Sequence, residues 1–188
     1  MTESRRENDA GWVAILVAFT MIAVHIAAKA NRDAIFLSTF TITDLPRMVI
    51  GAAMTSIGAV LLTSKAMVRW GPHRLVPLAF GASGVIYVGV WGLFRVTPQI
   101  AAIWLYLHVT AFGVILISGF WSLLNERFDP HTAKRVVGRV VAASTLGGLI
   151  GGIGAERFAA WLDVDKILLV LGGLHLTCGL LARKLSVP

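Results

Sequence analysis

The chain of 188 residues has a composition that excludes an ordinary water-soluble domain. Hydrophobic residues make up 56% of it and charged residues only 14%, whereas about a quarter of the residues in a soluble domain are charged. The formal charge of +7 does not indicate nucleic-acid binding, because the basic residues are dispersed and form no single stripe with interleaved aromatic residues. The charges stand in short clusters between long uncharged runs, which predicts a membrane protein.

Six uncharged runs approach the length of about 20 apolar residues that a helix needs to cross a bilayer. The predicted spans cover residues 11–28, 48–64, 75–94, 99–124, 140–155 and 167–182. The last two runs are short, but flanking basic residues such as Arg157 and Lys166 can extend along the helix and place their charges at the interface. The sequence therefore predicts an all-α membrane domain over residues 11–185, with a tail at 1–10 and a short end at 186–188.

Tryptophan and basic residues indicate where the spans end and how they are oriented. Five of the six tryptophans stand at or near run ends, where indole rings favour the headgroup zone: Trp12, Trp70, Trp91, Trp121 and Trp161. Alternate connections differ in their content of Lys and Arg. The richer side has Arg5, Arg6, Lys65, Arg69, Arg74, Arg127, Lys134, Arg135, Arg139, Arg183 and Lys184, and the poorer side has Lys29, Arg32, Arg47, Arg95, Arg157 and Lys166. The richer side, with both termini, is expected in the cytoplasm, and the first span is expected to be retained because no signal-peptide cleavage site is evident.

Two histidines, His25 and His108, lie well inside the first and fourth predicted spans. Ionisable side chains are costly within a membrane and often mark functional sites. If spans one to three and four to six form two inverted three-helix repeats, these histidines occupy corresponding helices, which flank the midplane site of such transporters. Together with Lys29, one turn beyond His25, they are candidate substrate-binding or proton-binding residues. Neutral histidines hydrogen-bonded between helices are the alternative.

Further charges border the connection between the first two spans, which is expected to be a loop that includes the apolar stretch 35–37. Arg32 and Asp33 close the first span, and Asp44 and Arg47 open the second. These charges are candidates for a gate at the outer mouth. Solvated anchoring at the membrane interface is the alternative for each of them.

The fifth predicted span carries pairs of glycines one turn apart. Gly147 lies on one face with Gly151, and Gly148 with Gly152. Such small-residue faces allow two helices to approach closely, either as static packing or as a sliding surface between moving halves. A phosphate-binding loop is excluded because no Lys-Ser/Thr follows the glycines, and no metal or cofactor motif is evident elsewhere.

A serine and a histidine offer an enzymatic alternative. The run from Gly81 through Ser83 to Gly84, and His175 followed by Gly179, resemble the serine and histidine motifs of rhomboid intramembrane proteases. That resemblance would make Ser83 a nucleophile and His175 its base. The spans concerned are the third and sixth, which are antiparallel, whereas the corresponding rhomboid helices are parallel. No His or Asn on the second span offers help with an oxyanion.

The six spans and the basic turn at 69–74 resemble one half of a major facilitator transporter. The turn Arg69-Trp-Gly71-Pro-His-Arg74 is a degraded likeness of that superfamily's Asp-Arg-x-Gly-Arg signature, with Val68 in place of the acidic residue. Several segments look more specifically like bacterial relatives of the ATP/ADP translocase (nucleotide transporter) family: Arg32-Asp33-Ala-Ile-Phe36-Leu37-Ser, Leu45-Pro46, Phe120-Trp121 with Asn125, and Ala133-Lys134-Arg135.

This resemblance implies exchange or uptake of a nucleotide or another anionic metabolite by alternating access in a bacterial inner membrane. Lys29 is the position that would contribute basic charge to the substrate site. Members of that family have about twice as many spans, and the site of such folds forms between two halves. A homodimer or a second six-helix half is therefore the expected partner, besides the lipid bilayer. A non-transporting scaffold subunit is the remaining alternative, which suits the short loops.

Overall fold

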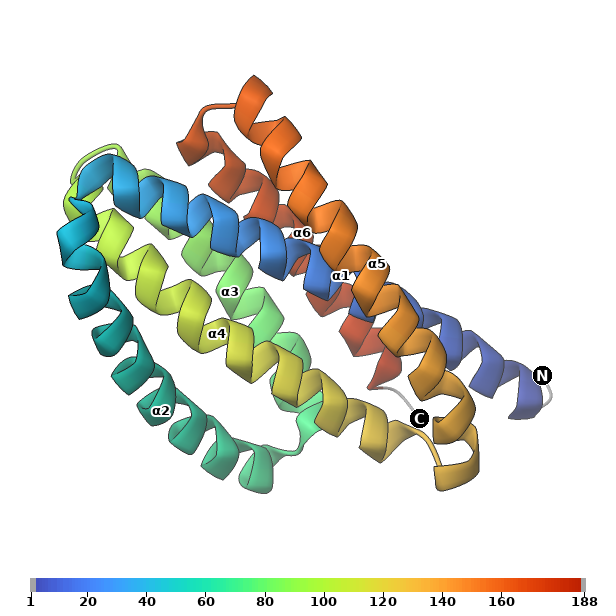
Figure 1. Ribbon diagram of the computed structural model, residues 1–188. Helices are drawn as coiled ribbons and strands as arrows, with labels where there is room; N and C mark the ends of the chain where they lie inside the picture. The colour runs from blue at the N-terminus through green and yellow to red at the C-terminus, as the bar shows by residue number, and fades with distance from the viewer. Residues whose placement is uncertain (1–2, 187–188) are drawn as a thin grey trace.

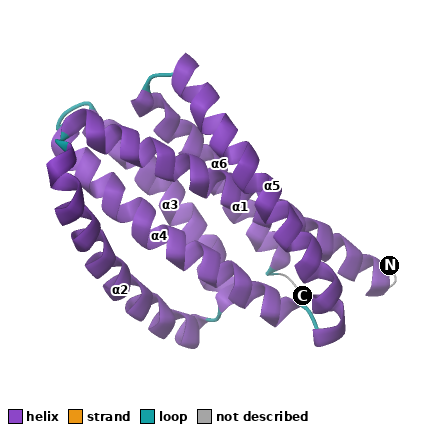
Figure 2. Ribbon diagram, in the orientation of Figure 1, coloured by secondary structure: helices purple, strands orange, loops and turns teal. Residues whose placement is uncertain are grey.

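The computed structural model describes residues 3–186, and within that range every regular element is a helix (Figure 2). The elements are α1 (Glu3–Thr39), the 3-10 turn η1 (Ile42–Asp44), α2 (Leu45–Trp70), α3 (Pro72–Phe94), α4 (Pro98–Arg127), α5 (Pro130–Trp161) and α6 (Val164–Leu185). Each α-helix is long and apolar enough to cross a membrane, and each predicted span lies inside one of them. The expectation of an all-α protein with six long apolar helices that could span a membrane is confirmed.

Prolines and one glycine determine where several helices begin. Pro46, Pro72, Pro98 and Pro130 stand in the first turn of α2, α3, α4 and α5, where the missing N–H group of proline would have no partner within the helix anyway. Gly71 joins α2 to α3 with a φ of +76°, a backbone conformation that residues with a Cβ rarely adopt. The chain can therefore reverse direction there in a single residue.

The first helix differs most from the sequence-based expectation. The predicted loop after residue 28 is absent, because α1 continues to Thr39. The apolar stretch 35–37 explains the difference, since Ile35 and Phe36 are buried and the ring of Phe36 packs edge-on against Tyr106 of α4. The prediction of a loop here was wrong, and Arg32 lies on a continuous helix. At the other end, the segment expected as a tail is helical from Glu3, whereas residues 1–2 and 187–188 lie outside the described part of the chain.

The helices form two layers (Figure 1). In one layer the order is α2, α4, α1, α5, and each helix packs against its neighbour. Behind it α3 pairs with α6, and these two also pack against α4 and α1 respectively. The two central helices, α1 and α4, therefore have neighbours on several sides, whereas α2 packs mainly against α4. The start of α1 and the end of α6 lie at the same end of the bundle (Figure 1).

Two large apolar clusters fill the interior, one towards each end of the bundle, and a small third one joins Phe36 and Ala52 to Tyr106. One contains Phe80, Phe120 and Leu123, and the other contains Tyr87 and Leu105. Along each inner helix the chain passes from one cluster to the other near its middle. Two of the buried polar side chains described below, Ser83 on α3 and His175 on α6, lie between the two clusters.

Candidate functional site

A groove of about 610 Å³ lies between α1, α2 and α4. α1 contributes His25, Lys29 and Arg32 to its wall, and their spacing of four and then three residues places them on one face of the helix. The side chains from α2 are the small or medium Val49 and Ala52. α4 contributes Tyr106, Val109, Thr110, Gly113, Val114, Ile117 and Ser118. The groove therefore gathers three basic side chains in a wall that is otherwise mostly apolar.

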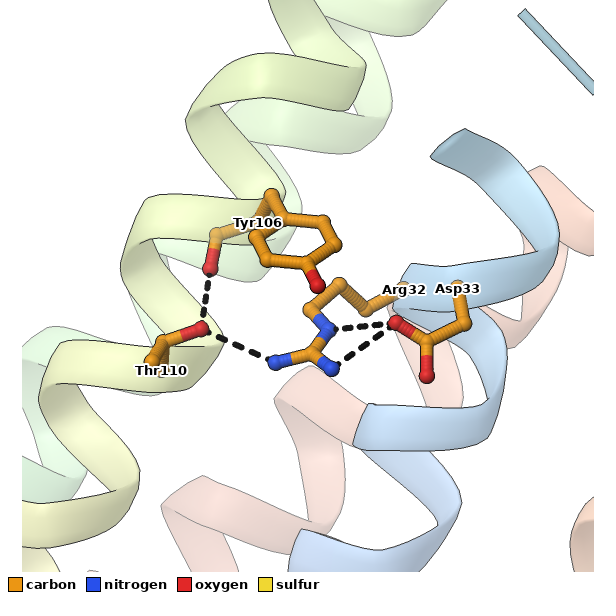
Figure 3. A network of polar contacts seen from close by, with 4 residues as sticks. All are labelled: Arg32, Asp33, Tyr106 and Thr110. Atoms are coloured by element: carbon orange, nitrogen blue, oxygen red, sulfur yellow. Dashed lines mark hydrogen bonds and ion pairs between the residues drawn. The ribbon is translucent and has the colours of Figure 1, made fainter. Parts of the chain in front are cut away.

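Arg32 is held firmly in this wall (Figure 3). Its side chain is nearly buried. Its guanidinium lies 4.1 Å from the centre of the Tyr106 ring and makes a cation–π contact with it. Its Nη1 donates a hydrogen bond of 2.9 Å to Thr110 Oγ1, and its Nε and Nη2 lie 2.9 and 2.8 Å from Oδ1 of Asp33. Thr110 in turn donates to the carbonyl oxygen of Tyr106. Arg32 is thus fixed by side chains from both α1 and α4.

Lys29 and His25 are held less tightly. Lys29 is exposed, and it has no ion-pair partner among the residues whose side chains are described. His25 is half-buried, and its ring lies against Gly113 of α4 so closely that a Cβ at that position would overlap it. A residue with a Cβ at position 113 would therefore force the His25 ring to shift.

A second, buried group of polar side chains lies behind the groove. Ser83 of α3 and His108 of α4 are hydrogen-bonded, with 3.0 Å between Oγ and Nε2. The Tyr87 ring packs against both His108 and His175, at centroid distances of 5.1 and 4.9 Å. His175 Nδ1 lies 3.0 Å from the carbonyl oxygen of Leu171. A cavity of about 10 Å³, lined by His25, Ser83, Tyr87 and His175 among others, adjoins this group and has room for about one water molecule.

The candidate residues from the sequence thus lie in different parts of the structure. His25, Lys29 and Arg32 line the groove, but His108 does not, because it is buried against Ser83. Asp33 is about half exposed and pairs with Arg32 on its own helix. The structure therefore separates His108 from the two residues with which the sequence analysis had grouped it.

The glycines of α5 lie on the opposite side of α1 from the groove. A Cβ at Gly147 or Gly151 would overlap the carbonyl oxygens of Phe19 and Ala23, so at these two positions the helix backbones touch. Gly148 and Gly152 have ordinary space around them. Only one of the two glycine faces is therefore in close helix contact.

The geometry does not support a serine protease. Ser83 is fully buried and its hydroxyl pairs with His108, whereas His175 hydrogen-bonds to its own helix. Within residues 3–186 no hydrogen bond joins Ser83 to His175, as a nucleophile and its base would require.

Sequence reasoning missed Tyr106, Thr110 and Gly113, which form the α4 wall of the groove. Their spacing of four and three residues matches that of the basic residues on α1 and places them on one helix face. A stripe of polar and small residues in an otherwise apolar span was the signal that could have identified them.

Neither a search for metal-binding groups nor comparisons with known proteins identify the site further. Among the described residues no group of three or more His, Cys, Asp or Glu side chains could hold a metal ion. Comparisons with protein-family models, with curated proteins and with solved structures give no match for this chain.

Proposed function

We propose that this chain is one six-helix half of an alternating-access transporter for a small anionic metabolite, with nucleotides as the first candidates. The observation that carries the proposal is the groove between α1, α2 and α4, in which Lys29 has no described ion-pair partner and Arg32 is fixed beside it. Basic side chains at membrane depth are costly unless they serve a pathway or a ligand. An anion in the groove would supply the missing counter-charge.

The two cations would play different parts in binding. Three hydrogen bonds and ion-pair contacts use the Nε–H, one Nη1–H and one Nη2–H of Arg32, so two of its five N–H donors remain for an anion. Lys29 is free to move and to present its ammonium group as a point charge. Arg32 would orient an anionic group, and Lys29 would close over it.

The packing of the helices supports a repeat of two inverted three-helix units. In such a repeat α1 corresponds to α4, α2 to α5 and α3 to α6, and corresponding helices should have the same neighbours. This holds for two pairs of contacts: α1 packs against α5 as α4 packs against α2, and α1 packs against α6 as α4 packs against α3. In transporters built from such repeats, the substrate site lies near the midplane, where repeats meet. The layer α2, α4, α1, α5 would then face a second half, either another copy of this chain or a separate six-helix chain.

The exposed side of α2 is consistent with a partner or lipid against it. Its exposed large apolar side chains are Val49, Ile50, Met54, Ile57, Leu61, Leu62, Val68 and Trp70. We place the end of the bundle that is rich in Lys and Arg in the cytoplasm, and the protein in a bacterial inner membrane.

Transport assays in liposomes test this proposal. Purified protein would be reconstituted and assayed with radiolabelled ATP, ADP and a panel of smaller organic anions. Lys29→Ala should lower the rate of uptake about tenfold or more, because a hydrogen bond to a charged group contributes about 1.5–3 kcal/mol. Lys29→Arg should retain part of the activity.

Lys166→Ala is the matched control for this experiment. Lys166 is also exposed and near the same end of the bundle, but it pairs with Asp163 and lies outside the groove. Equal uptake by the wild type and Lys29→Ala would refute the site. A protein that transports none of these solutes, and that is recovered with a stoichiometric partner, would instead favour a scaffold subunit.

A further inference from the structure

We propose that His25 is a proton-binding site that couples the anion groove to the proton gradient, so that an anion and a proton bind together. This inference rests on the proposed transport function. It assigns the coupling ion, and it gives His25 a role that differs from those of Lys29 and Arg32.

The position of His25 is the first argument. Its side chain lines both the groove, which contains Lys29 and Arg32, and the small inner cavity, which contains Tyr87 and His175. Among the residues that line the two spaces, it is the one ionisable side chain common to both. A proton held by His25 is therefore adjacent to the anion on one side and to a polar interior on the other.

The charges around His25 give the second argument. On its own helix Lys29 and Arg32 face the same groove, and the carboxylate of Asp33 is paired with Arg32. The groove residues from α2 and α4 carry no ionisable group other than Tyr106. α5 packs against another face of α1, through Gly147 and Gly151, and its Glu156 lines a separate hollow there with Ala27 and Asn31.

From α3 and α6 only Ser83, Tyr87 and His175 face the inner cavity. No carboxylate is among the described residues that line the groove or the inner cavity. A proton on His25 would thus add a further positive charge beside two existing cations, which is unfavourable in an empty groove. A bound anion reverses this balance, because it attracts all three cations. Protonation of His25 and anion binding must then favour each other to the same degree.

The inner cavity offers a route for the proton. His175 can only donate from Nδ1 to the carbonyl oxygen of Leu171, so in the neutral ring Nε2 is an acceptor. Ser83, whose hydroxyl is hydrogen-bonded to His108, and Tyr87 line the same cavity, which has room for about one water molecule. A water molecule in this cavity would connect His25 to His175 on the side away from the anion.

Equilibrium binding to the purified protein tests the inference without depending on flux. Radiolabelled ATP serves as the probe, at about pH 8 and about pH 5.5, on either side of the ordinary titration of histidine. The wild type should bind ATP more tightly at the lower pH, by about 5- to 150-fold, the range of typical coupling between sites. His25→Gln, which cannot take up a proton, should lose most of this difference, and His25→Lys should bind tightly at both pH values.

His73→Gln is the matched control, because His73 lies at the start of α3, outside the groove, near Glu126. It should retain the pH dependence of the wild type, which also corrects for the titration of ATP itself. Absence of ATP binding by the wild type at either pH would contradict the proposed nucleotide site. Binding whose pH dependence is the same in His25→Gln as in His73→Gln would overturn the coupling alone.

Proton uptake by the wild type provides a test that does not depend on the folding of any variant. Adding ATP to the protein in weakly buffered solution with a pH-sensitive dye should remove protons from the solution, beyond those bound by ATP in a blank. No net uptake, or proton release, would overturn the inference.

Discussion

The two sides of α1 show how one helix can be sealed on one face and open on the other. Towards α5, Gly147 and Gly151 bring the backbones into contact with Phe19 and Ala23, which seals this face at mid-helix. Smaller hollows of about 360 and 260 Å³ lie along the same seam on either side of this contact. Towards α4 and α2, long basic side chains project into a groove of about 610 Å³. Small residues thus allow the close contact with α5, and the groove stays open because α2 contributes only Val49 and Ala52 to it.

The largest expected effect comes from breaking the sealed face. Gly151→Ala places a methyl group on the carbonyl oxygen of Ala23, so α1 and α5 must separate. We expect a loss of stability of about 1–3 kcal/mol or more, as for other overpacked sites. Gly152→Ala is the control, since a Cβ there meets only ordinary contact with Ile26. Thermal unfolding in detergent should separate the two variants, and equal midpoints would show that the seam is not close-packed.

The next effect tests the contact between α4 and the open face. Gly113→Ala should displace the His25 ring, because the new Cβ would overlap it. We expect a loss of stability of about 1–3 kcal/mol, together with a loss of the pH dependence of anion binding. Gly89→Ala has open space around its Cβ and should be neutral or slightly stabilising. A Gly113→Ala protein with wild-type stability and pH response would contradict the placement of His25.

A smaller effect is expected from loosening Arg32. Thr110→Val removes the hydroxyl that accepts a hydrogen bond from Arg32 Nη1, at about 1 kcal/mol, and should weaken anion binding several-fold. Thr145→Val is the matched control. Like Thr110, Thr145 donates a hydrogen bond to the carbonyl oxygen four residues earlier, but it lies on α5, outside the groove. Isothermal titration of both variants with ATP measures the difference, and identical affinities would exclude a role for Thr110 in holding Arg32.

The smallest effect concerns Asp129, far from both faces of α1, at the start of α5. Hydrogen bonds from Thr132 and His131 lower the pKa of this carboxyl below its ordinary value. The ionised form therefore stabilises the folded helix start at neutral pH, and this contribution is lost as the pH falls through the folded-state pKa. Asp129→Asn should flatten the decline in melting temperature between about pH 5 and about pH 3. A decline as steep as that of the wild type would assign it to other carboxyl groups.

The sequence predicted the helices better than it predicted the site. Long uncharged runs require helices in a bilayer because the backbone must satisfy its own hydrogen bonds, so the six elements could be identified without the fold. The end of α1 could not, because the burial of Ile35 and Phe36 depends on contact with α4. Local charge favoured a loop there, and tertiary packing extended the helix.

Which residues form the site also depends on how the helices pack together. The spacing of His25, Lys29 and Arg32 on one helix face was visible in the sequence. The separation of His108 from them was not, because it depends on which side of α4 faces α3 and Ser83. The close approach of Gly113 to His25 likewise depends on the distance between two helices that are far apart in the chain.

The central claim is that water and anions reach a positively charged groove between α1, α2 and α4, and thiol modification tests it most directly. Val114 is exposed in that groove, and Cys178, the chain's one cysteine, is buried. The reaction rates of a cysteine at position 114 are measured in a Cys178→Ala background, each divided by the rate of a free thiol with the same reagent. Val114→Cys should react faster with an anionic than with a cationic methanethiosulfonate. Adding Lys29→Ala should reduce this preference. Leu180→Cys, on the exposed face of α6, should react slowly with both. No reaction at position 114, or a preference for the cationic reagent, would contradict the account.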